Sequence, residues 1–322
     1  MGGSGSGKSA LGLQLAQKLN CEIFSLDSLA VYKYFDIVSA KPSQAELQHI
    51  FHYGINILKP DQDNNAPFFR QLLLQAIQES KNKGKNTLLI IGGSSFYLKS
   101  ILEGLSPLPP HTKSKEIAQK IAKLDNPYSF LSQIDPSYAL NCKDSYRIHR
   151  GLEIYFATLT PPSLFFATYP KEAFPYPIEK YAIAIDRELL RARIAKRTEL
   201  MLKNGLLEEI KEIYTNYDYT IQPSSAIGVK ESLEFLTQTP LQALQGKTPR
   251  EKSSYIAQTP QELCNLISTH TAQLAKRQST FNRTQFGEVH SLCQSKKEIR
   301  QSARESIVWG SAEELLEFIE YS

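Results

Sequence analysis

The sequence has few cysteines and no long apolar run, and both absences limit what the protein can be. Its 4 cysteines lie far apart and form no C-x-x-C pair, which argues against a disulfide framework or a thiolate metal site. We therefore expect reduced thiols and a cytoplasmic protein. No uninterrupted apolar segment approaches the ~20 residues of a membrane-spanning helix, and the glycine- and serine-rich N-terminus does not resemble a secretory signal. We expect no membrane association.

Extreme charge and a histidine metal site are also absent. The net charge of +4 is compatible with a polyanionic partner without indicating one. Only His49 and His52 stand at helical spacing among the 6 histidines, and no carboxylate or cysteine cluster joins them. Cations do gather beside aromatic or polar side chains in two segments, KDSYRIHR (143–150) and AKRQSTFNR (275–283).

The order of apolar segments predicts a parallel α/β sheet, because strands alternate with helices. The first part of the chain favours helices at 8–19, 43–50, 67–84 and 94–104, and strands at 21–26, 53–58 and 86–93. The strand at 86–93 is the most continuous apolar run, typical of a strand buried on both faces. Gly84 suits the left-handed position that ends the helix before it.

This pattern stops at the proline-rich segment LSPLPPHTK (105–113). Only helices are predicted from there to about residue 167, a strand returns at 181–186, and helices continue to about residue 280. We therefore predict a P-loop NTPase-like α/β core formed by residues 1–106 and 179–322, with a helical insertion at 107–178.

The first residues contain the pattern G-x-x-x-x-G-K-S, typical of a phosphate-binding loop. Its glycines let backbone N–H groups surround a phosphate, Lys8 adds a positive charge, and the Ser9 hydroxyl suits Mg²⁺. A glycine–serine linker is the alternative, but an amphipathic helix follows directly from Lys8. The pattern alone does not distinguish a kinase, an ATPase or another phosphate-using enzyme. We expect the loop to bind phosphate through Gly2, Gly3, Ser4, Gly5, Ser6, Gly7, Lys8 and Ser9.

Two further polar segments follow predicted strands. In DSLAVYK (27–33), Asp27 could bind Mg²⁺, act as a general base or cap a helix. In IIGGSSFYLK (90–99), two glycines allow close backbone approach and Ser94 places a hydroxyl before a helix, or simply caps it. Ligands of parallel sheets bind at the carboxyl ends of the strands. We therefore expect the loop, Asp27 and Ser94 at one edge of the sheet.

The segment HTAQLAKRQSTFNR (270–283) is rich in cations. Lys276 and Arg277 could close a helix, where their charge favours its C-terminal dipole. That explanation leaves Arg283 and the intervening Phe281 unexplained. Cations mixed with aromatic rings are typical of contacts with single-stranded nucleic acid.

Taken together, these segments resemble bacterial tRNA dimethylallyltransferases through nearly the whole chain. The matching segments occur in the family's order: GGSGSGKS (2–9), DSLAVYK (27–33), SAKPS (39–43), GGSSFYLK (92–99), EGLSPLP (103–109), YRIHRGLEIY (146–155), MLKNGLLEE (201–209), AIGVKE (226–231) and LAKRQSTF (274–281). The family transfers a dimethylallyl group from its diphosphate to N6 of the adenosine 3′ of the tRNA anticodon.

The resemblance implies a role for each segment. The loop, with Lys276 and Arg277, would bind the donor diphosphate, aided by Mg²⁺ on Ser9. Lys8, Asp27 as the base and Ser94 in place of a family threonine would be catalytic. Asp27, Ser28, Leu29 and Ala30 would contact the target adenosine. The insertion would clamp the anticodon stem-loop of a tRNA bound by a monomer. Further tRNA contacts are then expected at Lys115, Tyr146, Arg147, Ile148, His149, Arg150 and Arg283.

Several departures from the family pattern leave alternatives open. Ala272 stands where an arginine is usual, and Lys276, one turn further along, is expected to compensate in part. Phe281 replaces a tryptophan, and Gly3 replaces a proline. No strand precedes the loop, so we expect the native protein to begin upstream and this chain to have reduced stability and a mobile loop. The alternatives are an adenylate isopentenyltransferase, a small-molecule kinase, or a catalytically impaired tRNA-binding relative.

Overall fold

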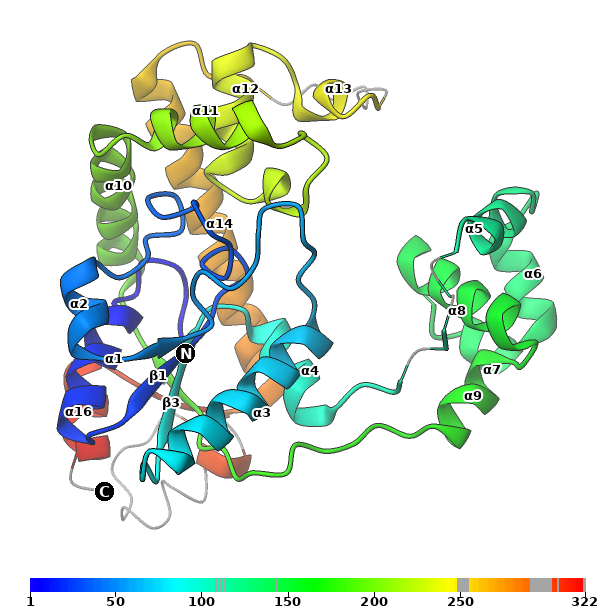
Figure 1. Ribbon diagram of the computed structural model, residues 1–322, viewed down its shortest axis with the longest axis horizontal. Coiled ribbons are helices and arrows are strands. Elements are labelled where there is room, and N and C mark those ends of the chain that lie inside the picture. The colour runs from blue at the N-terminus through cyan, green and yellow to red at the C-terminus, as the bar shows by residue number, and fades with distance from the viewer. Residues whose placement is uncertain are drawn as a thin grey trace. The chain divides into compact units, whose positions relative to one another are not determined.

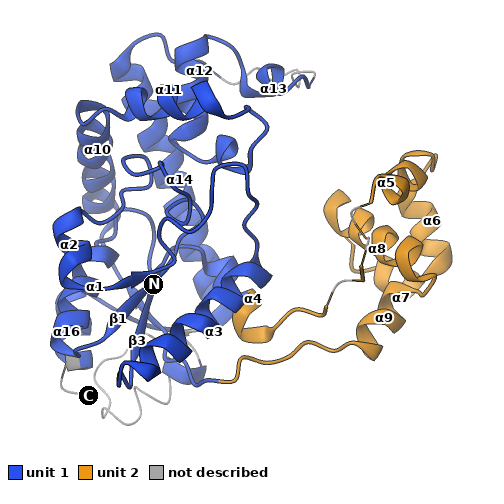
Figure 2. Cartoon of the chain, viewed as in Figure 1, with its two compact units in different colours: residues 1–99, 176–322 blue, residues 100–175 orange. Residues whose placement is uncertain are grey.

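The computed structural model describes residues 1–107, 109, 110, 112, 114–142, 144–247, 255–289, 303–305 and 307–320. The chain divides into two compact units, residues 1–99 with 176–322 and residues 100–175 (Figure 2). The predicted insertion, 107–178, and the second unit thus differ at both boundaries. None of the described helices is both long and apolar enough to cross a membrane.

The described residues of the first unit form two parallel three-stranded sheets. In one, β1 (Glu22–Leu26) lies between β2 (His52–Tyr53) and β3 (Leu88–Gly92). Figure 1 labels two neighbouring strands of this sheet, β1 and β3. In the other, β6 (Ile307–Gly310) lies between β4 (Tyr181–Ile183) and β5 (Glu288–Val289). Backbone groups of Met1 bond to Tyr181 and Ile183, so the start of the phosphate loop runs beside β4. The predicted parallel α/β architecture is confirmed.

Helices flank these strands. Helix α1 (Lys8–Lys18) begins inside the loop motif, buries Leu11 and Leu15, and packs against α16 (Ala312–Glu320) and β3. Helix α3 (Ala66–Asn82) is capped by Asn65 at its start, and Gly84 follows it at φ +75°, as predicted for that glycine. The remaining helices of this unit are α2 (Gln44–His49), α4 (Ser95–Glu103, which crosses into the second unit), α10 (Arg187–Lys203), α11 (Leu206–Asn216), the 3₁₀ turn η1 (Gln222–Ser225), α12 (Val229–Thr237), α13 (Leu241–Leu244) and α14 (Pro260–Phe286).

Three sequence-based expectations about this unit are wrong. The strand predicted at 53–58 ends at Tyr53, because Gly54 and Asn56 adopt positive φ values of +80° and +57°. Strand β3 is half-buried along its length, since β1 is its only strand partner in the described residues. Lys276 and Arg277 do not close a helix, because α14 continues to Phe286. Strands β5 and β6 and helix α16 were not predicted.

The second unit is helical. Its helices are α5 (Lys115–Ala122), α6 (Pro127–Ile134), α7 (Pro136–Ala139), α8 (Ser145–Thr158) and α9 (Pro162–Thr168). Side chains of Ile117, Leu131 and Leu152 form its buried core, with α5 and α6 packed on α8. Gly151 lets the ring of Tyr138 in α7 approach α8 closely, because a Cβ there would lie 2.5 Å from that ring.

Candidate active site

A cavity of about 780 Å³ lies at the carboxyl ends of β1 and β3. It brings together the three segments that the sequence places at this edge: the phosphate loop, the turn after β1 and the turn after β3. The predicted residues that line it are Ser4, Gly5, Gly7, Lys8, Ser9, Asp27, Ser28, Leu29, Ala30, Ser94 and Arg277. Gly2, Gly3, Ser6, Lys276 and Arg283 are not among the lining residues.

The loop has the backbone that its glycines predict. Gly5 and Gly7 adopt φ values of +83° and +94°, and Gly7 precedes the first turn of α1. The Lys8 ammonium donates to the carbonyl of Gly3 at 2.8 Å, so the lysine lies across the loop. Burial lowers the pKa of Lys8 to about 8, partly opposed by the charge of Asp27. The site thus contains an ammonium group, that of Lys8, whose pKa of about 8 is not far above neutral pH. This group lines the space where a phosphate would bind.

Asp27 caps the turn that follows β1. Its Oδ1 accepts hydrogen bonds from the backbone N–H groups of Leu29 at 2.8 Å and Ala30 at 3.1 Å. Its other oxygen, Oδ2, accepts no hydrogen bond from the described residues. Oδ1 therefore caps the turn, whereas Oδ2 stays available to accept a proton or to bind a cation.

Sequence reasoning missed Gln278, which joins two walls of the cavity. Its Oε1 accepts from the backbone N–H of Ser4 at 3.0 Å, and its Nε2 donates to the carbonyl of Gly93 at 2.8 Å. One amide group therefore connects the phosphate loop to the turn that carries Ser94. The segment LAKRQ was interpreted through its cations alone, and its glutamine gives no signal of its own.

Two arginines of α10 were also missed. Arg197 donates from Nη2 to the hydroxyl of Ser4 at 2.8 Å, and Arg193 lies 3.4 Å from the position of a Cβ on Gly7. Both line the cavity, whereas Lys276 is exposed outside it. Helix α10, which packs along α14, thus places two cations at the cavity that were not predicted from the sequence. The i, i+4 spacing in RARIAKR (191–197) is the signal that could have identified them.

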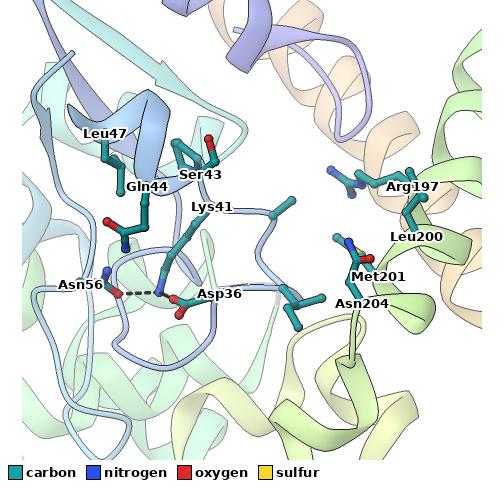
Figure 3. A pocket seen from close by; sticks show the side chains of 13 residues that line it. Asp36, Lys41, Ser43, Gln44, Leu47, Asn56, Arg197, Leu200, Met201 and Asn204 are labelled. Atoms are coloured by element: carbon teal, nitrogen blue, oxygen red, sulfur yellow. Dashed lines mark hydrogen bonds and ion pairs between the residues drawn. The ribbon is translucent and has the colours of Figure 1, made fainter. Parts of the chain in front are cut away.

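A smaller cavity of about 450 Å³ shares Arg197 and Lys41 with the first (Figure 3). One wall comes from the segment between Asp36 and Leu47 and the other from α10. The Lys41 ammonium donates to Asp36 at 2.7 Å, to Asn56 at 2.6 Å and to the carbonyl of Tyr32 at 2.6 Å. This buried lysine therefore holds the SAKPS segment in place.

The predicted cations of the second unit have different surroundings. Arg147, in the first turn of α8, is exposed and lies 3.6 Å from Asp144, whereas Arg150 forms a closer pair with Glu153 at 2.5 Å. Ile148 packs against the helical core, and Tyr146 is 75% exposed. Lys115 and His149 are exposed. In the first unit, Arg283 lies over the ring of Trp309, 5.1 Å from its centroid.

The cavity also offers oxygen ligands. The Ser9 hydroxyl and the Asp27 carboxylate both line it, and the described residues contain no group of three or more His, Cys, Asp or Glu side chains that could enclose a metal ion. Mg²⁺ commonly binds through one or two protein oxygens together with substrate phosphates and water. These residues therefore fit a magnesium ion that arrives with a phosphate ligand.

The chain is similar in sequence to proteins of one activity. Residues 30–285 match the family "IPP transferase". The chain is 46% identical to the tRNA dimethylallyltransferase of Helicobacter hepaticus, over 91% of this chain and 92% of that protein. It is 48% identical to a protein of the same description from Helicobacter pylori, with 90% and 88% covered, and 42% identical to that of Wolinella succinogenes, with 91% and 93% covered.

Solved structures agree on the fold. The tRNA isopentenylpyrophosphate transferase of Bacillus halodurans superimposes with a TM-score of 0.63 at 22% identity, over 99% of this chain and 92% of that chain. A eukaryotic dimethylallyltransferase acting on tRNA superimposes with a TM-score of 0.69 at 25% identity, over 96% and 72%. These structures confirm the predicted P-loop NTPase-like α/β fold.

Proposed function

Because this chain belongs to the IPP transferase family, we propose that it is a prenyltransferase that moves the dimethylallyl group of dimethylallyl diphosphate to N6 of the adenosine 3′ of the anticodon in tRNA. Prenyl transfer to tRNA is the activity named for its relatives, which are similar over about nine-tenths of the chain. The observation that supports this reaction is that the phosphate loop, Asp27 and Ser94 line the same cavity.

The donor side of the reaction is assigned to the loop. Its backbone N–H groups lie at the N-terminus of α1, where the helix dipole favours an anion. Lys8, Arg197 and Arg277 add positive charge around the same space. These groups stabilise diphosphate as the allylic C–O bond breaks and charge moves onto the leaving oxygen.

The acceptor side is assigned to the turn after β1. The exocyclic N6 attacks the allylic carbon, a new C–N bond forms, and N6 must lose one proton. Asp27 Oδ2 accepts that proton, while Oδ1 remains bonded to the turn. Ser28, Leu29 and Ala30 line the cavity beside it and contact the adenine. The adenosine has to leave its stack to reach this position.

Magnesium would be held by the Ser9 hydroxyl, which lines the cavity beside the phosphate loop. When bound, Mg²⁺ neutralises charge on the diphosphate and makes it a better leaving group. The protein's own part is to place the Ser9 hydroxyl and to surround the remaining phosphate charge with the loop N–H groups and the cations that line the cavity.

The helical unit is assigned to the anticodon stem-loop. Its exposed cations Lys115 and Arg147 are suited to phosphate contacts, and exposed Tyr146 to stacking on an unpaired base. Arg150 contributes less, because Glu153 already neutralises it at 2.5 Å. This unit distinguishes the proposal from prenylation of a free nucleotide, which needs no stem-loop contacts.

The test is transfer of labelled dimethylallyl groups from dimethylallyl diphosphate with Mg²⁺ to unmodified tRNA, with AMP as a parallel acceptor. We expect label in tRNA, its loss with Lys8→Ala, and wild-type rates with Lys211→Ala, an exposed lysine on α11. Label in AMP alone would identify a free-nucleotide enzyme, and tRNA binding without label a catalytically impaired relative.

A second variant separates the two roles of Asp27. Asp27→Asn keeps an oxygen that accepts from the turn but removes the basic carboxylate. We expect a folded protein that has lost about 10²–10⁴-fold in rate, the usual contribution of a general base. A rate near that of the wild type would show that another group takes the proton.

A further inference from the structure

Behind the turn that carries Asp27 lies a hydrogen-bond network centred on one buried side chain. Asn64 is only 4% exposed. Its Nδ2 donates to the carbonyl of Ser28 at 2.8 Å, and its Oδ1 accepts from the hydroxyl of Tyr97 at 2.7 Å. The side-chain amide of Asn64 is therefore bonded through both its donor and its acceptor end.

The backbone of Asn64 is also engaged. Its N–H donates to Oε1 of Gln222 at 2.7 Å, and its carbonyl accepts from Nε2 of the same amide at 3.1 Å. Gln222 Oε1 further accepts from the hydroxyl of buried Tyr32 at 2.8 Å. Burial raises the pKa of Tyr32 to about 12 and also raises that of Tyr97. Both phenols therefore stay protonated, and remain donors, at any working pH.

The groups joined at Asn64 come from three walls of the cavity. Ser28 belongs to the turn after β1, and Tyr97 lies in the first turn of α4, just after Ser94. Gln222 begins η1, which leads directly into the cavity-lining residues 225–228. Asn64 thus connects the turn that carries Asp27 to α4, which follows Ser94, through its side chain, and to η1 through its backbone.

We infer that Asn64 is a positioning residue for the acceptor adenosine, which rests on the function proposed above. Asp27 Oδ1 is bonded to Leu29 and Ala30, so the carboxylate moves with the turn. The Asn64–Ser28 bond anchors that turn from behind. Asn64 therefore sets where Oδ2 of Asp27 lies relative to the incoming N6, without touching the substrate.

The decisive variant is Asn64→Asp, which has the same shape. An aspartate oxygen still accepts from Tyr97 but replaces the Nδ2 donor by an acceptor that faces the Ser28 carbonyl. The neighbouring Asn65→Asp is the matched control, because Asn65 is exposed and only accepts a bond from the N–H of Phe68 as the cap of α3. Aspartate caps a helix as well as asparagine does.

The readouts are single-turnover transfer to tRNA with saturating donor, binding of inorganic diphosphate with Mg²⁺, and the thermal midpoint. For Asn64→Asp we expect transfer slowed by about tenfold or more, the factor for one lost hydrogen bond of ~1.4 kcal/mol. Diphosphate affinity should stay within about twofold, since the loop makes none of these bonds. Asn65→Asp should match the wild type in all three measurements.

Tyr97→Phe is the second variant, because it removes one donor to Asn64 and retains the ring. We expect a smaller slowing of transfer in the same direction, and this variant decides the question if Asn64→Asp does not fold. Unchanged transfer, or transfer and diphosphate binding that fall together with the folded fraction, would overturn the inference. A wild-type protein that prenylates no tRNA would instead refute the proposed function, and this inference with it.

Discussion

The guanidinium of Arg197 donates a hydrogen bond to the hydroxyl of Ser4, 2.8 Å away, and so joins α10 to the phosphate loop. The two residues are far apart in the sequence. The bond places a cation of α10 directly beside the phosphate loop. Arg193 lies one turn earlier on the same helix and lines the same cavity. The cavity is thus lined by cations of α10 as well as by Arg277 of α14.

Replacing Arg197 by glutamine should weaken donor binding. A charge-assisted hydrogen bond contributes ~1.5–3 kcal/mol, so we expect the KM for dimethylallyl diphosphate to rise about tenfold to a hundredfold. The KM for tRNA should change little. Ser4→Ala removes the same hydrogen bond but leaves the guanidinium, and a similar loss in that variant would show that Arg197 acts by holding the loop and not by its charge.

Donor binding should depend on pH through Lys8. The pKa of Lys8 in the ligand-free protein is lowered by burial to about 8, so the ammonium loses its proton above that pH. The ratio of the wild-type affinity for inorganic diphosphate to that of Lys8→Met, in which the ligand's own titration cancels, should then be constant below about pH 8 and fall by up to ~tenfold per pH unit above it. Titration calorimetry of both proteins at several pH values measures this ratio, and a ratio that does not change with pH would contradict the prediction.

The same lysine should affect stability in the opposite direction. Its pKa of about 8 in the folded protein lies below the ordinary lysine value of 10.5. The unfolded chain therefore binds more protons between these two pH values, and the contribution of Lys8 to the free energy of unfolding rises with pH across that interval. The free energies of unfolding of the wild type and Lys8→Met, measured by denaturant titration, should therefore differ less at pH 10 than at pH 8.

Gln278 should couple the loop to the turn that carries Ser94. In Gln278→Glu the carboxylate still accepts from the N–H of Ser4 but no longer donates to the carbonyl of Gly93. It also places a negative charge beside the diphosphate site. We expect both a higher KM for the donor and a lower kcat, with kcat/KM reduced by about a hundredfold. A variant with only a raised KM would limit Gln278 to donor binding.

Arg147 and Arg150 should differ in their contribution to tRNA binding. Arg147 is exposed and only loosely paired, at 3.6 Å from Asp144, whereas Arg150 is paired at 2.5 Å with Glu153. Arg147→Ala should weaken binding and reduce the slope of log affinity against log salt by about 1. Arg150→Ala should leave the slope closer to that of the wild type, as filter binding at several salt concentrations will reveal.

Much of the fold could be predicted from residues that lie close together in the chain. Helix α3 has its asparagine cap, its amphipathic spacing and its closing Gly84 within one segment, and its bounds were predicted nearly to the residue. The segment 53–58 has strand-like composition, yet Gly54 and Asn56 turn the chain at positive φ. Strand β6 is four residues long and buried, and so short a segment has no period that separates it from other apolar runs.

The sequence by itself determined the phosphate loop, the order of strands and helices from α1 to α4, and the placement of Asp27 and Ser94 after strands, because each depends on residues close together in the chain. Only the tertiary structure decided that Arg197 reaches Ser4, that Gln278 bridges the loop and Gly93, and that Asn64 holds Ser28. Hydrogen bonds between distant segments depend on how helices pack across the sheet, and no local pattern of residues encodes that packing.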